Sequence, residues 1–208
     1  MRNRDRIARR VLLGAVIAIF ALSAQGPKPT CANCPATYIA SSEIQAYLTR
    51  AVENRLVDQQ ARAVDIGKSN IGIGVVYRGK LAAPAPDSVA EHDLVSEVYH
   101  VIDGSATLVT GPDIADLKRR PADLQTVREF NGPGNGGSTI RNGVTHELKA
   151  GDVIVIPAGT GHWFTKIDDH IRYIMVRIDP DKVLPLKNEA QSQTYLRSAP
   201  SAGKNKQQ

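Results

Sequence analysis

The segment from Gly151 to Thr165 restricts the fold more than any other part of the chain. Alternating aliphatic residues over 153–156 predict a short β-strand, which the turn sequence Pro-Ala-Gly-Thr-Gly follows directly. A second strand-forming run begins at His162. Because such a turn reverses the chain tightly, we expect His162 at the start of a strand, where its imidazole can point into a barrel.

Short β-forming segments continue on both sides of this turn, separated by Gly, Pro and Asn. They include residues 71–77, and further strands are predicted at 97–102, 105–110, 144–148, 162–167 and 171–178. Many short strands with regular turns are typical of a sandwich or a closed double-sheet jelly roll. The sequence therefore predicts an all-β fold for residues 58–186.

One helix is expected before these strands. Ser41-Ser42-Glu43 is typical of a helix start, and apolar residues then recur at spacings of three and four: Ile44, Tyr47, Leu48, Ala51, Val52 and Leu56. This pattern predicts an amphipathic helix over 41–57. Residues 25–40 are rich in proline and small side chains, which is typical of a linker.

Residues 1–24 predict export. Five arginines precede an apolar stretch over 11–22, and the small residues Ser23 and Ala24 follow, as in a secretory signal peptide. A membrane-spanning helix needs about 20 apolar residues, so we expect no permanent span. We therefore expect a periplasmic or secreted protein.

The net charge of +5 does not describe the body of the chain. The positive excess lies in residues 1–24 and in the polar tail 187–208, so that residues 25–186 carry a net charge of −2. A nucleic-acid-binding domain is usually basic, and we expect no nucleic-acid partner. The composition of the tail predicts disorder.

The two cysteines, Cys31 and Cys34, are separated by two residues. In an oxidising compartment a disulfide between them is the favoured interpretation. Its stabilising effect should be small, because so short a loop constrains the unfolded chain little.

Residues 111–143 interrupt the regular pattern of strands. The stretch contains the glycine-rich run Gly132 to Gly137 and is too long for a simple hairpin. Two interpretations are open: an irregular surface loop, or a lid over the mouth of a barrel.

Two motifs in this chain resemble those of the cupin superfamily. The first reads His, four residues, Glu, six residues, Gly, at His92, Glu97 and Gly104. The second reads Gly, five residues, Pro-x-Gly, two residues, His, at Gly151, Pro157, Gly159 and His162. The chain departs from the family pattern at Ala90, where the first motif has another histidine, and at Lys166, where the second motif has asparagine.

The resemblance implies a cupin β-barrel with a divalent metal ion held by His92, Glu97 and His162. Two imidazoles and one carboxylate suit Fe, Mn, Ni or Zn and leave coordination positions open. The metal identity stays open, and Ala90 raises the alternative of a degenerate site. Glu91 and Asp93 could compensate, although strand alternation points them away from the face of His92.

Strand alternation places Tyr99 and Val101 on the same face as Glu97, and His100 and Ile102 on the other. Beside a cation, the phenol of Tyr99 would have a lowered pKa and could act as a base or as a hydrogen-bond donor. Tyr99 is therefore the candidate catalytic residue. A packing role in the barrel wall is the alternative.

The expected function is that of an exported, metal-dependent enzyme, an oxygenase, isomerase or lyase, acting on a small polar molecule. The alternative is a non-catalytic cupin module that binds a sugar or a small acid. A small-molecule ligand is expected in both cases, and the resemblance allows a homodimer.

Overall fold

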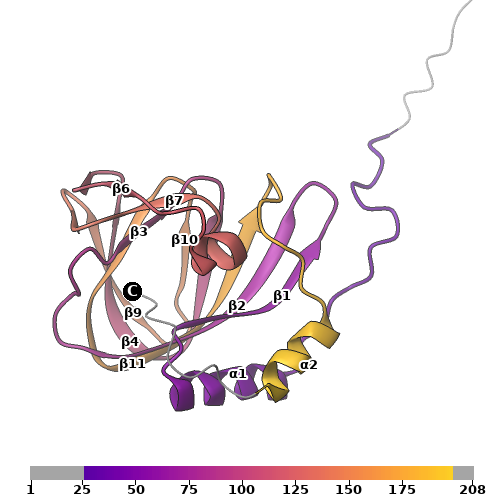
Figure 1. The fold of residues 1–208 in the computed structure, drawn as a ribbon, viewed down its shortest axis with the longest axis horizontal. Helices are drawn as coiled ribbons and strands as arrows, with labels where there is room; N and C mark the ends of the chain where they lie inside the picture. The colour runs from indigo at the N-terminus through magenta and orange to yellow at the C-terminus, as the bar shows by residue number, and fades with distance from the viewer. Residues whose placement is uncertain (1–25, 199–208) are drawn as a thin grey trace, which may run out of the picture.

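The computed structural model describes residues 26–198. The expected signal peptide over 1–24 and residues 199–208 lie outside this range. Helix α1 (Ser41–Asn54) precedes the strands, and α2 (Glu189–Arg197) follows them (Figure 1). The strands are β1 (Asp58–Asp65), β2 (Asn70–Leu81), β3 (Val89–His92), β4 (Ser96–Gly111), β5 (Ile114–Ala115), β6 (Lys118–Arg119), β7 (Gly134–Gly137), β8 (Thr139–Ile140), β9 (Val144–Lys149), β10 (Val153–Ile156) and β11 (Gly161–Asp179).

Two long strands, β4 and β11, form the frame of the barrel. They pair with each other along most of their length, while β11 also pairs with β2 and β3, and β4 with β9 and β10. Irregularities in register between Phe164 and Ile171 let β11 bend from one sheet into the other. All these pairings are antiparallel, so the predicted all-β barrel is confirmed.

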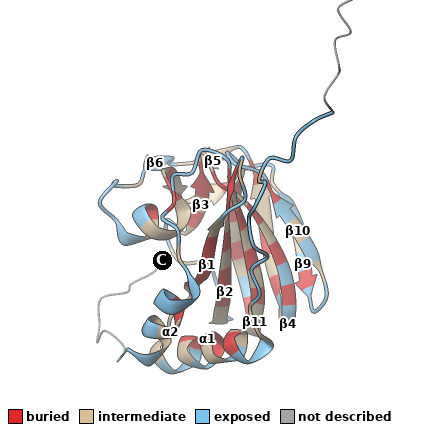
Figure 2. Ribbon diagram, turned by 90° about the vertical axis from the view of Figure 1, so that its right-hand side faces the viewer, coloured by how far each residue is buried: buried red, intermediate tan, exposed pale blue. Residues whose placement is uncertain are grey.

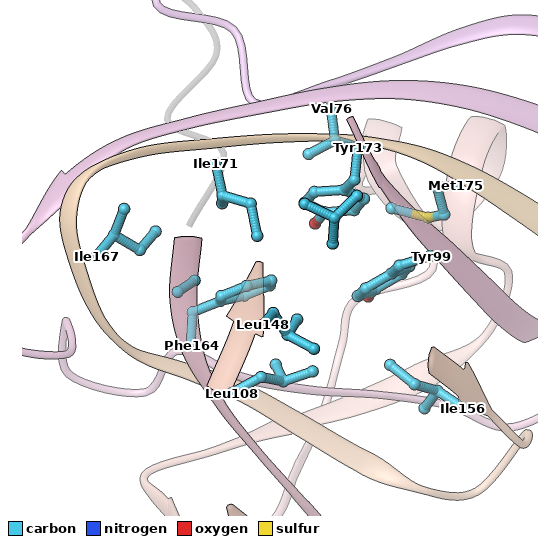
Figure 3. Packing of buried hydrophobic residues seen from close by; sticks show 12 residues of the cluster. Val76, Tyr99, Leu108, Leu148, Ile156, Phe164, Ile167, Ile171, Tyr173 and Met175 are labelled. Carbon is cyan, nitrogen blue, oxygen red and sulfur yellow. The ribbon is translucent and has the colours of Figure 1, made fainter. Parts of the chain in front are cut away.

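The interior of the barrel is filled by apolar and aromatic side chains. Along β4 the predicted alternation is confirmed, since Tyr99 and Val101 are buried whereas His100 and Ile102 are exposed. Burial of such side chains stabilises a fold by about 25 cal/mol per Å² of apolar surface. Figure 3 shows the cluster, which contains Val76, Tyr99, Leu108, Leu148, Ile156, Phe164, Ile167, Ile171, Tyr173 and Met175.

Helix α1 packs against the outside of the barrel, beside β1 and β2. It begins at Ser41 as expected and ends three residues before the predicted boundary, because Arg55 adopts a left-handed conformation with φ 53°. Tyr47 and Leu48 are buried on its inner face. Glu43 accepts two hydrogen bonds, of 2.7 and 3.0 Å, from the buried Arg62 of β1.

The prediction of a disordered tail is wrong for its first part, because residues 189–197 form α2. Asn188 and Gln191 form a capping box at its start, which satisfies backbone N–H groups there. Tyr195 stacks on Tyr47 of α1 with ring centroids 5.7 Å apart, and Figure 2 shows the two helices side by side. The polar composition of the tail obscured the apolar contacts of Tyr195 and Leu196 with the cluster around Tyr47.

The segment 111–143 is not an irregular loop. It contains β5 to β8 and a π-helical turn, Val127–Asn131. The glycine-rich strand β7 pairs with β3, and a Cβ atom on Gly134 would lie 2.1 Å from the carbonyl oxygen of Glu91, so only glycine fits there. Figure 1 shows β3, β6 and β7 together at the end of the barrel opposite α1.

The segment that precedes α1 forms neither helix nor strand between residues 26 and 40. Cys31 and Cys34 are joined in the predicted disulfide. In the stretch from 26 to 198, neither helix has the length and apolar character needed to cross a membrane.

Candidate metal centre

The turn between β10 and β11 joins the two motifs. Gly159 has φ 79°, a conformation that favours glycine, and its N–H donates a 2.8 Å hydrogen bond to the carbonyl oxygen of His92. His162 then stands at the second position of β11, where it pairs with Ala90 of β3. The local backbone therefore brings His162 and His92 to the same point of the barrel wall.

His92, Glu97 and His162 converge inside the barrel. Nε2 of His92 lies 3.5 Å from Oε1 of Glu97, and Nε2 of His162 lies 3.6 Å from Oε2. One potential ligand atom from each residue lies within 4.8 Å of the others, and all three side chains are buried. The structure thus groups the three predicted ligands into a set that could hold a metal ion.

The protonation states suit metal binding. Burial lowers the pKa of His92 to about 3 and also lowers that of His162, so both imidazoles are neutral near pH 7. Burial by itself raises the pKa of Glu97, but the neighbouring imidazoles, the guanidinium of Arg177 and a hydrogen bond from Tyr99 lower it to about 2. The site therefore presents two neutral imidazoles and one carboxylate.

The spacing of the donor atoms also fits an ion. Separations of 3.5 and 3.6 Å exceed a normal hydrogen bond of about 2.7 to 3.2 Å. Two ligands that each lie about 2.1 Å from one ion would be roughly 3 to 3.5 Å apart. Nδ1 of His162 lies 3.3 Å from the carbonyl oxygen of Thr160, so Nε2 is the nitrogen that points toward Glu97 and could bind the ion.

Tyr99 lines the site, but its environment is not that of a base. Its hydroxyl donates a 2.7 Å hydrogen bond to Oε2 of Glu97. Burial, and then the negative charge of Glu97, raise the pKa of Tyr99 well above its ordinary value. Of the two roles expected from the sequence, the geometry therefore favours the hydrogen-bond donor.

The departures from the family motifs have different consequences. Ala90 lines the cavity beside His92, so the missing histidine leaves space there. Lys166 is exposed and pairs with Asp168, away from the site. Glu91 and Asp93 accept hydrogen bonds from Asn135 and do not join the three ligands, as strand alternation predicted.

A cavity of about 240 Å³ opens beside the three ligands. Its wall includes Arg120, Thr126 and Asn131 from the segment 111–143, so this segment contributes to the site. The other lining residues are Val57, Asp58, Arg78, Leu81, Ala85, Ser88, Ala90, Tyr99, Phe164 and Met175.

The sequence interpretation missed the arginines around this cavity. Arg177 is fully buried, with its Nε 3.6 Å from Oε1 of Glu97, and it pairs with Asp58. Its place on β11, two residues after the inward-facing Met175, was a usable signal. Arg120 lies in a segment without periodicity, so alternation could not have identified it.

The remaining histidines lie outside the three-ligand set. His146 contacts the hydroxyl of Thr110 at 2.9 Å, and His170 contacts Asp103 at 3.2 Å. His100 is exposed. None of these three histidines therefore contributes to the metal centre.

No protein-family model matches this sequence, and no curated protein matches it. Solved structures of low sequence identity align with part of this chain. A protein from Bacillus halodurans is 14% identical, with 77% of this chain and 96% of that chain covered and a TM-score of 0.41. A cupin protein from Bacteroides fragilis is 14% identical, with coverages of 57% and 72% and a TM-score of 0.32. The cupin domain of Cnp3 from Schizosaccharomyces pombe is 13% identical, with coverages of 59% and 64% and a TM-score of 0.33.

Proposed function

We propose that this chain, whose motifs and barrel resemble those of the cupin superfamily, binds one divalent metal ion through His92, Glu97 and His162 and acts as an enzyme on a small polar molecule. The convergence of three buried donor side chains beside a cavity carries this proposal. An exposed cluster of acidic groups would be weaker support, because such clusters are common without a metal.

A bound Fe, Mn, Ni or Zn ion would supply Lewis-acid chemistry at an oxygen atom of the substrate. The chain itself would hold and orient that substrate. Tyr99 keeps Glu97 in place through its hydrogen bond, and the remaining lone pairs of its oxygen can accept a hydrogen bond in the cavity. The reaction class we propose is oxygenation, isomerisation or lyase chemistry.

A non-catalytic binding module is the second candidate, and Ala90 favours it because a ligand of the family pattern is absent there. The two candidates differ in the effect of His162→Ala. The test loads each of the four metals into the metal-free protein and measures turnover of small hydroxy acids, keto acids and sugars. If one metal gives turnover and His162→Ala abolishes it, the enzyme is supported. If the protein binds a small molecule and His162→Ala leaves that binding unchanged, the module is supported.

We further propose that the protein is exported, with cleavage near residue 24. The disulfide between Cys31 and Cys34 supports this proposal, because disulfides persist in oxidising compartments. The intact mass of the protein purified from its own cells is the test. A mass that still contains residues 1–24 contradicts the proposal.

We also propose a homodimer through the outer face of β10. Val153 and Val155, which lie on the same face of this strand, are each 61% exposed and offer an apolar surface to a second copy. Light scattering on the purified protein should give twice the chain mass, and Val153→Lys should halve it. A monomer at all concentrations contradicts this proposal.

A further inference from the structure

Two arginines line the cavity without an anionic partner in direct contact. Arg78 comes from β2, and Arg120 follows β6 in the segment 111–143. A third arginine, Arg177, also lies close to the site, but Asp58 and Gln60 already bind its guanidinium. The charges of Arg78 and Arg120 are therefore the ones available to a ligand.

Arg120 is the clearer case. Its backbone N–H is bound by the carbonyl oxygen of Gly134 at 3.0 Å, while its guanidinium makes no hydrogen bond or ion pair with any residue between 26 and 198. Burial lowers its pKa, ahead of the opposing effects of Glu97 and Glu91. A partly desolvated cation without a direct partner is costly, and an anion from solution would offset that cost.

Arg78 is held rigidly with its outer nitrogens free. Its guanidinium lies over the ring of Phe164 at 4.5 Å, and its Nε donates a 3.2 Å hydrogen bond to the hydroxyl of Tyr173. Neither terminal nitrogen donates a hydrogen bond to another described residue. Such a fixed planar fork suits the two oxygens of a carboxylate or a phosphate.

The charge around the cavity becomes positive once a metal binds. The guanidiniums of Arg78, Arg120 and Arg177 are balanced by the carboxylates of Asp58, Glu97 and Glu91, the last of which acts on Arg120, whereas the imidazoles are neutral. A divalent ion would therefore leave a positive excess that an anionic ligand can offset.

We propose that the cavity binds a small organic acid, whose carboxylate or phosphate group is held by Arg120 and Arg78 beside the three metal ligands. This inference deepens the proposed function and rests on it for the ligand's second contact, which is to the metal. The anionic contact itself requires only the two arginines.

Malonate and inorganic phosphate are the probes for this test, with glycerol as the neutral comparison. Binding is measured by calorimetry with the metal-free and the metal-loaded protein, and the metal content of each sample is determined separately. The metal-free protein should bind malonate or phosphate but not glycerol, and the metal should tighten this binding. Preference for malonate assigns a carboxylate ligand, and preference for phosphate assigns a phosphate.

Arg120→Gln should weaken anion binding by about tenfold or more, which is about 1.4 kcal/mol. Its metal content should be unchanged. Arg119→Gln is the matched control, because the neighbouring Arg119 is 57% exposed and paired with Asp93, and this variant should bind the anion normally. If Arg120→Gln does not fold, Arg120→Lys replaces it in the test. This variant keeps the charge without the planar fork and should show an intermediate anion affinity.

Equal anion affinity in Arg120→Gln and in the unmodified protein would overturn the inference, as would equally tight binding of glycerol. A protein that binds the anion but never a metal contradicts the proposed enzyme and leaves the anion site standing. The two failures are therefore distinguishable.

Discussion

Ala90 lies directly opposite His162 in the pairing of β3 with β11, at the position where the first cupin motif has a histidine. It shares a strand face with His92 and lines the same cavity. The site consequently has three donor side chains and an open side next to Ala90. This relationship explains how the chain can depart from the motif and still present a compact set of ligands.

Restoring a histidine at this position should tighten metal binding. In Ala90→His a third imidazole, and thus a fourth donor side chain, enters the cavity beside His92 and His162, and we expect the dissociation constant of the metal to fall by about tenfold or more. Competition with a chelator of known affinity measures it. Ala90→Leu fills the same space without a donor atom and should give no gain. An affinity that is the same in all three proteins would show that position 90 does not face the metal.

Tyr99 should influence the affinity for the metal through its hydrogen bond to Glu97. Tyr99→Phe removes the 2.7 Å hydrogen bond to the carboxylate, and loss of such an outer contact typically weakens metal binding by about tenfold to a hundredfold. Tyr173→Phe is the matched control, since its ring centroid is 4.5 Å from that of Tyr99 but its hydroxyl bonds to Arg78. Equal metal affinities of the two variants would contradict the positioning role.

Much of this architecture could be predicted from the sequence because strand alternation is a local property. The period of two along β4 correctly placed Glu97 and Tyr99 inside, and the spacing of the motifs brought His92 and His162 together. The contribution of the segment 111–143 could not be predicted, because β7 consists of residues whose role is close backbone contact with β3. Helix α2 was missed because its stability depends on a distant partner, the ring of Tyr47.

The ion pair between α1 and β1 should be important for stability. Arg62 is 2% exposed, and Glu43→Ala would leave its charge buried and unpaired, at a cost of about 3 to 5 kcal/mol in the free energy of unfolding. Urea denaturation measures this loss. Asp113→Ala breaks the exposed pair with Arg141 and should cost less than about 1 kcal/mol. Similar losses in both variants would contradict the difference in burial.

Because of Lys187, the free energy of unfolding should rise at alkaline pH. Burial, followed by repulsion from Arg62, lowers its pKa from 10.5 to about 8. Between these two values the unfolded chain binds a proton that the folded chain has released, so the free energy of unfolding should increase with pH across this window. Burial raises the pKa of Tyr47 from 10.0 to about 12, so near pH 10 only the unfolded chain loses this phenolic proton, which opposes the rise at the upper end of the window.

The comparison for this effect is Lys187→Met, which keeps an apolar side chain beside the rings of Tyr47 and Tyr195. Urea unfolding at about pH 8 and about pH 9, below the ordinary pKa of tyrosine, should show a rise for the unmodified protein and a smaller one for the variant. Parallel changes in the two proteins would mean that Lys187 titrates normally in the fold.

The most direct test of the metal centre is the number of metal ions bound per chain, measured by mass spectrometry after the protein has been loaded with Fe, Mn, Ni or Zn and dialysed. One ion per chain is expected for the unmodified protein and for His170→Ala, whose imidazole lies outside the site. Glu97→Gln and His162→Ala should retain almost none, although they remain folded by circular dichroism. A chain that retains no metal under any loading condition, or variants that retain as much as the unmodified protein, would contradict the account.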